Sequence, residues 1–470
     1  MLETRFPFRR TRYFILTLLI GTCLPLNTDE VLGQPERISP KTVTQLKPKD
    51  PVSRRRVIYN FDGDSCMWTR ANSNGPVAID VDDLKTLIRE ITFEGSQVDT
   101  MLVCINAQVM YYPTKIGTMR GTQCTPEQRE KWPATEKQRF ATMKRFFDTG
   151  VDPYAIMLAE AKKRGLEALL TFRMNDAHGN DFLKTKFWLD HPEYRLGGAL
   201  DFTHDEVRDY VFHLIKEAVH RYDCDGIELD FNRFPTFFKN GTTEERIMKM
   251  NALVKRLRIM LDEEGKKRHR HLVLTARIPS NYGRTPPSYE TSRIIGCDPA
   301  AWAKNGWIDF LTISEFLYVR YDLPIAPWKK LITEVPIYGG IECIEAGSKS
   351  GNLTAKQYRL AAKNRWKDGA EGIYIFNFFT ARERNEEPPF KVLGELGDQD
   401  KFSHVISTET EYYTTGPQQG RPADGKFPAG TKINIVKKAG SYVLVNSEKG
   451  IKAYVSTNAI KLKKKTTSSK

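Results

Sequence analysis

The chain has 470 residues, of which 40% are hydrophobic and 11% aromatic, and a formal net charge of +14 at pH 7. This composition supplies a large core and excludes a wholly disordered chain. The excess of Lys and Arg is compatible with an anionic partner, but no nucleic-acid-binding motif accompanies it, so we expect no nucleic acid partner.

Residues 1–34 have the pattern of a signal peptide. Basic residues, among them Arg9 and Arg10, precede the apolar run 14–20, and small and polar residues follow as far as Gln34. The run is shorter than the roughly 20 residues that a membrane-spanning helix needs, so a retained anchor is the weaker alternative. We expect an exported protein, secreted or periplasmic, in which a Pro-, Lys- and Thr-rich linker occupies residues 35–55.

Residues 56–400 alternate short β-branched or aromatic runs with amphipathic stretches. The runs predict eight strands, at Val57–Asp62, Thr100–Gln108, Ala168–Asn175, Gly226–Asn232, Leu272–Pro279, Asp309–Glu315, Val335–Glu342 and Gly372–Phe378. The clearest predicted helices are Val81–Thr92, Asp152–Arg164, Asp205–Tyr222, Thr243–Glu264 and Thr354–Lys367. Eight such units favour the α/β class and a closed (β/α)₈ (TIM) barrel. The alternative is an open doubly wound sheet, but Asn60–Ser65 does not match its Gly-rich phosphate loop.

Residues 403–463 change to Thr-, Gly- and Lys-rich sequence with short alternating runs, which predicts a small all-β domain before a basic tail at 464–470. A Gly-Thr turn before one strand and a Tyr-Val-Ser step in the last one resemble a bacterial SH3-like module. The resemblance implies either binding of a cell-wall component or packing on a catalytic domain, and we favour the second.

Six cysteines remain after the predicted signal peptide: Cys66, Cys104, Cys124, Cys224, Cys297 and Cys343. An even number permits disulfides in an oxidising compartment, but buried free thiols fit the strand-like runs equally well. No pair has CxxC spacing, so we expect no structural zinc. The acids of Asp62-Gly-Asp64 are a weak signal for a hard cation. We therefore predict no required metal and no cofactor.

The carboxyl ends of barrel strands surround the active site, and alternate residues of each strand point into the lumen. In the fourth strand, Ile227, Leu229 and Phe231 would then face the outer helices, while Glu228, Asp230 and Asn232 face the lumen. The same parity on the other strands gives Asn60, Asp62, Asn106, Gln108, Arg173, Asn175, Thr275, Arg277, Ser314 and Glu342, with Glu315 adjacent.

This mouth of acids, amides and arginines suits a hydroxyl-rich ligand. His178 lies in the loop after the third strand, and aromatic residues could stack on sugar rings: Trp68, Tyr111, Tyr112, Phe231, Tyr282 and Tyr318. We predict a carbohydrate substrate and these binding residues: Asp62, Asn106, Arg173, Asn175, His178, Glu228, Asn232, Arg277 and Tyr318. The arginines could equally be structural counterions, and Glu228, which lies deeper, is expected to form an ion pair with one of them.

Glycoside hydrolysis usually needs one carboxylic acid and a second carboxylate that attacks or activates water. Asp230 is the predicted acid. Glu342 has the better lumen parity for the second carboxylate, while Glu315 lies where the strand bends into its loop, so we rank Glu342 ahead of Glu315.

The segment YDCDGIELDFNRFP resembles the fourth strand of glycoside-hydrolase-like barrels such as glycosyl-hydrolase-like family 10, and it is similar to the DGxDxDxE strand of family 18 chitinases. Against the chitinase pattern, Asp225, Glu228 and Asp230 take the three acidic positions. Asn232 stands where that pattern has its catalytic Glu. The resemblance implies a glycosidase barrel without the chitinase mechanism.

These observations predict an exported glycoside hydrolase that acts on a poly- or oligosaccharide, and the basic charge favours an anionic glycan over a neutral one. The main alternative is a noncatalytic glycan-binding or cell-surface protein on the same barrel. A metal-dependent deacetylase is disfavoured, because the 8 His residues do not pair at ligand spacing.

Overall fold

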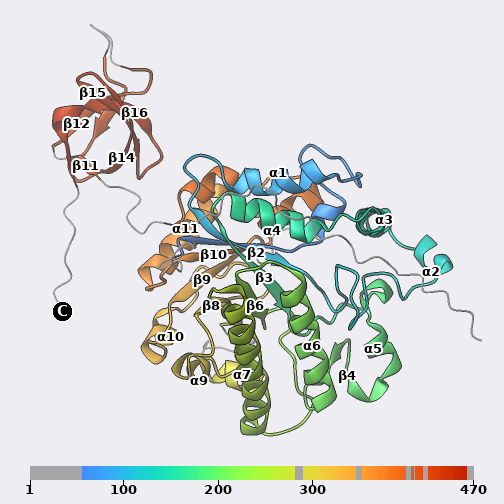
Figure 1. Ribbon diagram of the computed structural model, residues 1–470. Coiled ribbons are helices and arrows are strands. Elements are labelled where there is room, and N and C mark those ends of the chain that lie inside the picture. Colours follow the sequence, from blue (N-terminus) through green and yellow to red (C-terminus); the bar gives the residue numbers. More distant parts are fainter. Residues whose placement is uncertain are drawn as a thin grey trace, which may run out of the picture. The chain divides into compact units, whose positions relative to one another are not determined.

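The computed structural model describes residues 55–280, 289–345, 352–397, 404–406, 408–416 and 422–462. Eight strands close into a barrel in the order β1-β10-β9-β8-β7-β6-β3-β2 (Figure 1), and all neighbouring pairs are parallel. The strands are β1 (Val57–Phe61), β2 (Val98–Cys104), β3 (Glu167–Arg173), β6 (Gly226–Asp230), β7 (Val273–Pro279), β8 (Phe310–Ser314), β9 (Ile337–Glu342) and β10 (Ile373–Phe376).

All eight predicted strands are confirmed, and the closed barrel replaces the open-sheet alternative. Their runs are almost continuously buried, as expected when a parallel sheet is covered on both faces. The largest difference is at β2, which ends at Cys104 instead of Gln108. There Asn106 forms an antiparallel bridge with Met110, so the chain folds back on itself instead of continuing the strand.

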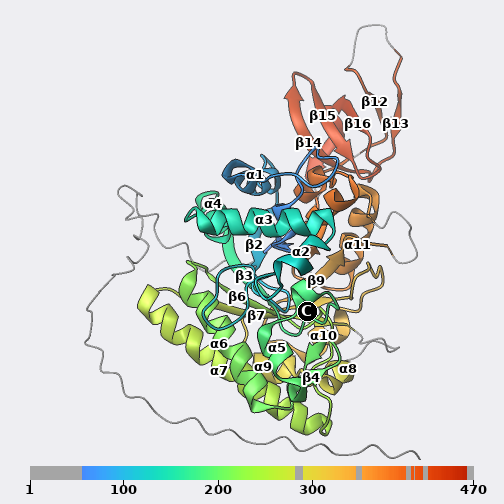
Figure 2. The same ribbon diagram turned by 90° about the vertical axis from the view of Figure 1, so that its right-hand side faces the viewer.

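Helices cover the barrel, and α6 and α7 run side by side on one flank (Figure 2). The helices are α1 (Val81–Ile91), α2 (Pro126–Glu130), α3 (Ala134–Asp148), α4 (Pro153–Lys163), α5 (Lys186–Asp190), α6 (Asp205–Arg221), α7 (Thr243–Arg268), α8 (Tyr289–Ile294), α9 (Pro299–Lys304), α10 (Ala326–Leu331) and α11 (Ala355–Lys367). Short 3₁₀ turns lie at η1 (Ser65–Met67), η2 (Asp181–Leu183), η3 (Pro192–Tyr194), η4 (Phe378–Arg384), η5 (Phe390–Gly394) and η6 (Thr457–Ala459), and β4 (Arg195–Leu196) pairs with β5 (Ala199–Leu200).

The five helices predicted most clearly are confirmed to within a few residues. Side-chain caps define several starts: Asp80, Thr242 and Thr354 each form a capping box at α1, α7 and α11. Helix α7 runs past the predicted end and stops at His269, which has left-handed backbone angles. Helix α7 contacts β7, the strand that carries Arg277.

The lumen is filled by side chains and changes character along its axis. An apolar cluster occupies it: Ile58, Leu102, Leu169, Val273, Phe310, Tyr338, Tyr374 and Phe376. Polar residues follow these positions along the same strands, as Arg277 follows Val273 on β7 and Glu342 follows Tyr338 on β9. The barrel is thus a packed core whose charged residues gather toward the carboxyl ends of its strands.

The C-terminal region is a seven-stranded sheet, described here by itself, with its own small apolar core that includes Phe427, Val443 and Val455. The pairings are antiparallel, in the order β13-β12-β16-β15-β14-β11-β17. The strands are β11 (His404–Ile406), β12 (Thr410–Tyr413), β13 (Gly425–Phe427), β14 (Lys432–Ala439), β15 (Tyr442–Ser447), β16 (Lys452–Ser456) and β17 (Ile460–Leu462). The predicted all-β region is confirmed, and its SH3-like identity stays a prediction.

The predicted signal peptide, the basic tail and all of the linker except Arg55 lie outside the described residues. Within the described ranges, no helix has the length and apolar character needed to cross a membrane. The six cysteines after the predicted signal peptide are all buried and free.

Candidate active site

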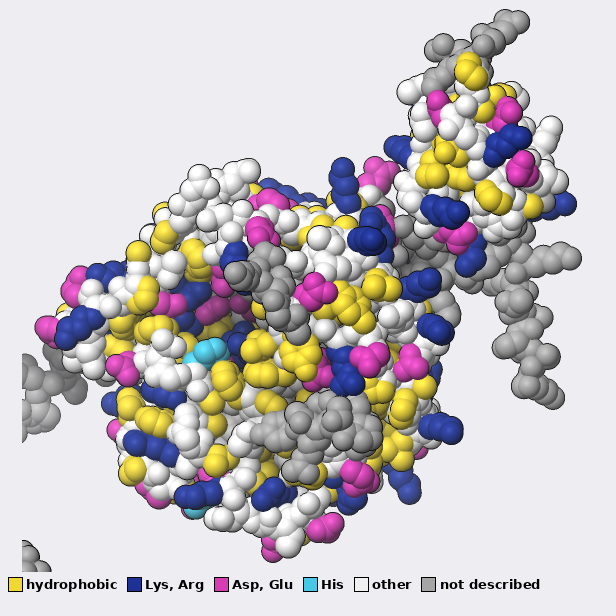
Figure 3. Space-filling view, turned by 180° about the vertical axis from the view of Figure 1, so that it is seen from behind, with side chains coloured by type: hydrophobic (Ala, Val, Ile, Leu, Met, Phe, Trp, Pro, Cys, Tyr) yellow, Lys and Arg dark blue, Asp and Glu magenta, His cyan; other side chains and the backbone are white. Residues whose placement is uncertain are grey.

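Charged side chains from β6, β7 and β9 meet inside the barrel at the carboxyl ends of the strands. Asp230, Arg277 and Glu342 expose 1%, 1% and 2% of their surface. Ile227 and Leu229 lie in the core cluster that also contains residues of the outer helices, so the predicted parity of β6 is confirmed. On the rear face of the molecule, acidic and basic side chains lie together in a depression rimmed by hydrophobic ones (Figure 3).

Arg277 holds Asp230 and Glu342 together. Its Nη1 donates to Asp230 Oδ2 at 3.2 Å, and its Nη2 donates to Glu342 Oε1 and to Ser314 Oγ at 3.3 Å. The guanidinium also lies over the ring of Phe376, 3.8 Å from its centroid. Because both carboxylates contact one guanidinium, the fold brings them to the same end of the barrel lumen.

The two acids differ in their surroundings. Asp230 accepts a second hydrogen bond, from the backbone N–H of Asn232 at 2.9 Å, so two donors are directed at its carboxyl group. Burial raises the pKa of Glu342 to about 7, although the charges of Arg277 and Arg233 oppose this. A protonated acid beside a carboxylate is the arrangement that separates acid from base or nucleophile.

Glu228 lies one layer deeper, and its predicted ion pair with Arg173 or Arg277 is wrong. Its Oε1 accepts hydrogen bonds from Thr171 and Tyr374, both at 2.8 Å, and from Asn60 at 3.2 Å. Arg277 instead reaches outward to Asp230 and Glu342. Burial, followed by the charge of Asp230, raises the pKa of Glu228 to about 7, and its hydrogen bonds join β6 to residues of β1, β3 and β10.

Glu315, the other candidate for the second carboxylate, points to a different place. Its Oε2 accepts a hydrogen bond from Ser280 Oγ at 2.9 Å and lies 3.6 Å from Arg320. No contact with Arg277 links it to Asp230 in the described part of the chain. Glu342 is therefore the acid that the fold brings to Asp230.

Three amide side chains that were predicted to bind substrate form hydrogen bonds within the protein. Asn106 donates to Ala107 O and Arg173 O and accepts from Arg173 N. The Asn175 side chain donates to Leu200 O and accepts from Leu200 N, and it also donates to Thr236 O. Asn232 donates to Glu315 O at 2.6 Å. These amides fix the loops of the mouth, and their contact with substrate stays a prediction.

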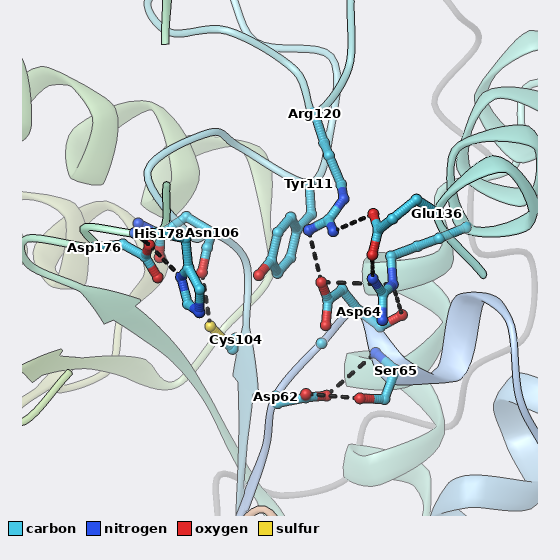
Figure 4. Close-up of polar contacts among 12 residues, drawn as sticks. Asp62, Asp64, Ser65, Cys104, Asn106, Tyr111, Arg120, Glu136, Asp176 and His178 are labelled. Carbon is cyan, nitrogen blue, oxygen red and sulfur yellow. Dashed lines mark hydrogen bonds and ion pairs between the residues drawn. The ribbon is translucent and has the colours of Figure 1, made fainter. Parts of the chain in front are cut away.

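His178 lies at the mouth, paired with Asp176. Its Nδ1 is 2.5 Å from Asp176 Oδ1 (Figure 4), and its side chain is 31% exposed. Burial alone would raise the pKa of Asp176, but hydrogen bonding to His178 and the charges of His178 and Arg173 lower it to about 2. Asp176 also accepts the backbone N–H of His178 at 3.0 Å, so it caps the turn and orients the imidazole.

The Asp62-Gly-Asp64 loop joins a network that sequence reasoning missed (Figure 4). Arg120 bridges Asp64 at 2.7 Å and Glu136 at 2.6 Å. Ser65 Oγ lies 2.7 Å from Asp62 Oδ2 and also contacts Glu383 Oε1. These partners come from a loop after β2, from α3 and from η4, far away in sequence. Asp64 is already in ion pairs with Arg120 and Arg139. No group of three potential metal ligands occurs among the described residues.

The aromatic residues at the mouth differ from those predicted. Tyr111, Tyr112 and Phe231 are 0% exposed, because they pack into the core between barrel and helices, so their predicted stacking on sugars is wrong. Trp68 is also buried, and Tyr282 lies outside the described residues. Tyr318 is 39% exposed as required. The half-buried Phe234 and Phe316, with ring centroids 5.9 Å apart, lie in neighbouring loops.

Part of this sequence matches a protein-family model. Residues 123–246 match the family model described as glycosyl hydrolase-like 10. The match extends from the loop before α2 into α7, so it includes Arg173, His178, Glu228 and Asp230. Over these residues the chain is similar to that family, as the sequence predicted, and the surrounding fold is the predicted closed eight-stranded parallel barrel.

Solved structures similar to this chain include three glycosidases of low identity. α-L-Fucosidase isoenzyme 2 from Paenibacillus thiaminolyticus is 11% identical, with a TM-score of 0.43 over 74% of this chain and 50% of its own. Chitinase ChiW from Paenibacillus sp. str. FPU-7 is 12% identical, with a TM-score of 0.41 over 85% of this chain and 51% of its own. The chain thus spans about half the length of these two.

A group IV chitinase from Ostrinia furnacalis, solved in complex with allosamidin, is 11% identical, with a TM-score of 0.39 over 72% of this chain and 97% of its own. A search of curated proteins found no match. These likenesses concern the fold.

Proposed function

We propose that this protein is an exported glycoside hydrolase that cleaves glycosidic bonds of a poly- or oligosaccharide with two carboxyl groups. One observation carries the proposal: Asp230 and Glu342 contact the same guanidinium at the carboxyl end of a glycoside-hydrolase-like barrel. In such barrels this end holds the catalytic residues.

The environments of the two acids suggest their roles. Glu342, with a pKa near 7, donates its proton to the glycosidic oxygen as the bond to the anomeric carbon breaks. Asp230, which accepts hydrogen bonds from Arg277 and from the Asn232 N–H, attacks that carbon or takes a proton from the attacking water. This assignment exchanges the roles expected from the sequence, because burial raises the pKa of Glu342 into the range that a general acid needs.

The position at which family 18 chitinases have their acid does not supply one here. Asn232 occupies it, and its side-chain amide donates to Glu315 O. The proposed reaction therefore depends on Asp230 and Glu342 and does not follow the chitinase route.

A noncatalytic glycan-binding protein is the second candidate, and one observation favours it. Arg277 already contacts both acids, and each is almost completely buried. In an enzyme, substrate binding has to give these acids access to the scissile bond.

The test is a screen of the purified protein on a glycan panel, with release of reducing ends as the readout. We expect Asp230→Asn and Glu342→Gln each to lower the rate by at least about a thousandfold, whereas the exposed Asp209→Asn leaves it unchanged. Undiminished release by Asp230→Asn refutes the assignment. Binding without release by the wild type supports the second candidate.

Export is a further part of the proposal, and so is the less favoured of the two roles expected for the C-terminal sheet, binding of a cell-wall component. Export rests on the basic and apolar pattern of residues 1–34. We expect the full chain to be found outside the cytoplasm and a chain lacking residues 1–34 to remain inside, as cell fractionation measures. Isolated cell walls should retain the full chain but release a chain that ends at residue 403.

A further inference from the structure

Two arginines at the mouth of the barrel lack full sets of partners. Arg233, in the loop after β6, is 9% exposed, and its Nε and Nη1 have no hydrogen bond acceptor among the described residues. Arg173, at the end of β3, is 7% exposed, and its Nε also has no hydrogen bond acceptor among the described residues. A buried cation with unused donors lowers the stability of a fold, so these groups need a physical explanation.

The acids around Arg233 already have other partners. Asp230 and Glu342 contact Arg277, and Asp176 contacts His178. Arg233 makes no ion pair within the described residues. Burial and then repulsion by Arg173 lower the pKa of Arg233, which shows that the two like charges act on each other. Arg173 lies 3.6 Å from Asp176, so Arg233 is the member of the two that holds positive charge at the mouth without an ion pair of its own among the described residues.

Aromatic rings lie beside this charge. The Arg233 guanidinium carbon is 5.7 Å from the ring centroid of Phe234 and 5.8 Å from that of Phe316. Leu317 and Tyr318, which follow Phe316, are exposed. Phe234 has a φ of +52°, a conformation that costs free energy for a bulky residue and recurs at ligand sites. The rings offer apolar faces for a sugar, and the guanidinium offers donors for a charged substituent.

We propose that Arg233, assisted by Arg173, binds the anionic substituent of a sugar residue whose ring lies against Phe234 and Phe316. Carboxylate and sulfate ester groups share the required chemistry, since both present paired oxygens to the planar fork of a guanidinium. The choice of a sugar as the carrier of the charge rests on the proposed glycosidase function. The preference for negative charge rests on the arginines alone.

The test measures binding by calorimetry to two matched pairs of glycans, with the Asp230→Asn protein to prevent turnover. One pair is oligogalacturonate and its methyl ester, and the other is a sulfated galactan oligosaccharide and its desulfated form. We expect one charged member to bind at least about tenfold more tightly than its neutral partner. The pair that shows the preference identifies carboxylate or sulfate ester as the ligand.

Variants then assign the preference to the arginine. Arg233→Gln in the same background should remove the preference, and Arg233→Lys should keep part of it, because Lys retains the charge but not the fork. The matched control is Arg256→Gln, which breaks an exposed pair with Asp209 on the outer helices and should change nothing. Thermal unfolding provides a second readout: Arg233→Gln should be at least as stable as its parent, since it removes a buried cation without acceptors.

Any one of three results overturns the inference. These are equal affinity for the charged and neutral members of both pairs, absence of binding to all four glycans, and an unchanged preference in Arg233→Gln. Failure of the proposed function is distinguishable. Charge-selective binding by the wild type without release of reducing ends contradicts hydrolysis alone, whereas hydrolysis that ignores charge and Arg233 contradicts this inference alone.

Discussion

At the scale of single residues, Arg277 determines the arrangement of the candidate site. Arg277, on β7, is 1% exposed and binds two acids from other strands: Asp230 on β6 and Glu342 on β9. A buried pair of this kind contributes little net stability when complete, but removal of one partner leaves uncompensated charge.

The first prediction is therefore that Arg277→Met lowers the free energy of unfolding by about 3–5 kcal/mol, as urea denaturation measures. The matched control is Arg256→Met, whose exposed pair with Asp209 should be worth less than about 1 kcal/mol. A loss of similar size in both variants would show that the buried network is not specially sensitive.

The second prediction concerns the pH dependence of hydrolysis. Glu342 must be protonated to act as the acid, and its pKa is about 7, so kcat/KM should fall as pH rises through about 7. Glu342→Gln should lose this alkaline limb together with most activity. Glu228 has a similar pKa but lies deeper, so Glu228→Gln should keep the limb. The opposite result for the two variants would assign the acid to Glu228.

At the scale of elements, η1 and η4 are joined across the seam where β1 meets β10. Ser65 Oγ contacts carboxylate oxygens of both Asp62 and Glu383. One hydroxyl has a single proton to donate, so one of the two acids has to donate in return and is protonated. Burial and then the charge of Asp62 raise the pKa of Glu383 to about 7.

The third prediction follows from the sign of this shift. A carboxyl whose pKa is raised on folding contributes stability below its ordinary pKa, and this contribution is lost as pH rises through the folded value. The melting temperature should therefore decline between about pH 5 and pH 8, and Glu383→Gln should make the decline shallower. Glu386→Gln, in the same segment but hydrogen-bonded to Asn352, is the control and should leave the profile unchanged.

The fourth prediction concerns the turn that places Asp62 and Asp64. Gly63 has a φ of +83°, and a Cβ there would lie 1.8 Å from the carbonyl oxygen of Cys104 on β2. Gly150 has a similar φ of +75°, but a Cβ there would meet nothing within 4 Å. Gly150→Ala should cost about 1 kcal/mol for backbone strain alone. Gly63→Ala should cost several times more, and equal losses in denaturation would contradict the clash.

At the scale of the whole molecule, the barrel and the C-terminal sheet have separate apolar cores. The two barrel clusters contain no residue beyond Leu396, and the sheet cluster begins at Phe427. Each core belongs to its own set of strands, so we expect two units that unfold separately.

The fifth prediction is that a chain ending at residue 403 keeps the barrel's thermal transition within a few degrees, roughly the shift of a 1 kcal/mol change. Calorimetry of the full chain should show a second, smaller transition that the shortened chain lacks. A large drop in the barrel's transition would show that the sheet stabilises it.

The sequence predicted the fold more fully than the site. Each strand is a local run of β-branched and aromatic residues, and each main helix has a local cap or amphipathic pattern, so eight strands and five helices could be found one by one. Strand parity placed Asp230, Arg277 and Glu342 in the lumen for the same reason. Parity could not show that Tyr111 and Phe231 are buried, because burial depends on the helices that cover them.

Other site residues had no local signal at all. Arg120, Glu136 and Glu383 reach the Asp62 loop from a loop, a helix and a 3₁₀ turn that only folding brings together. Asp176 caps the turn before His178, and its pairing with the His178 side chain depends on the shape that folding gives to that turn.

The sequence by itself thus determined the barrel, the all-β region and the inward-facing acids, because periodicity is a property of neighbouring residues. Only the tertiary structure decided which charges meet: Arg277 between Asp230 and Glu342, Glu228 without an ion pair, and Arg233 without an acceptor among the described residues. These outcomes depend on distances between strands and loops far apart in the chain, and on the burial that raises the pKa of Glu342 toward neutrality.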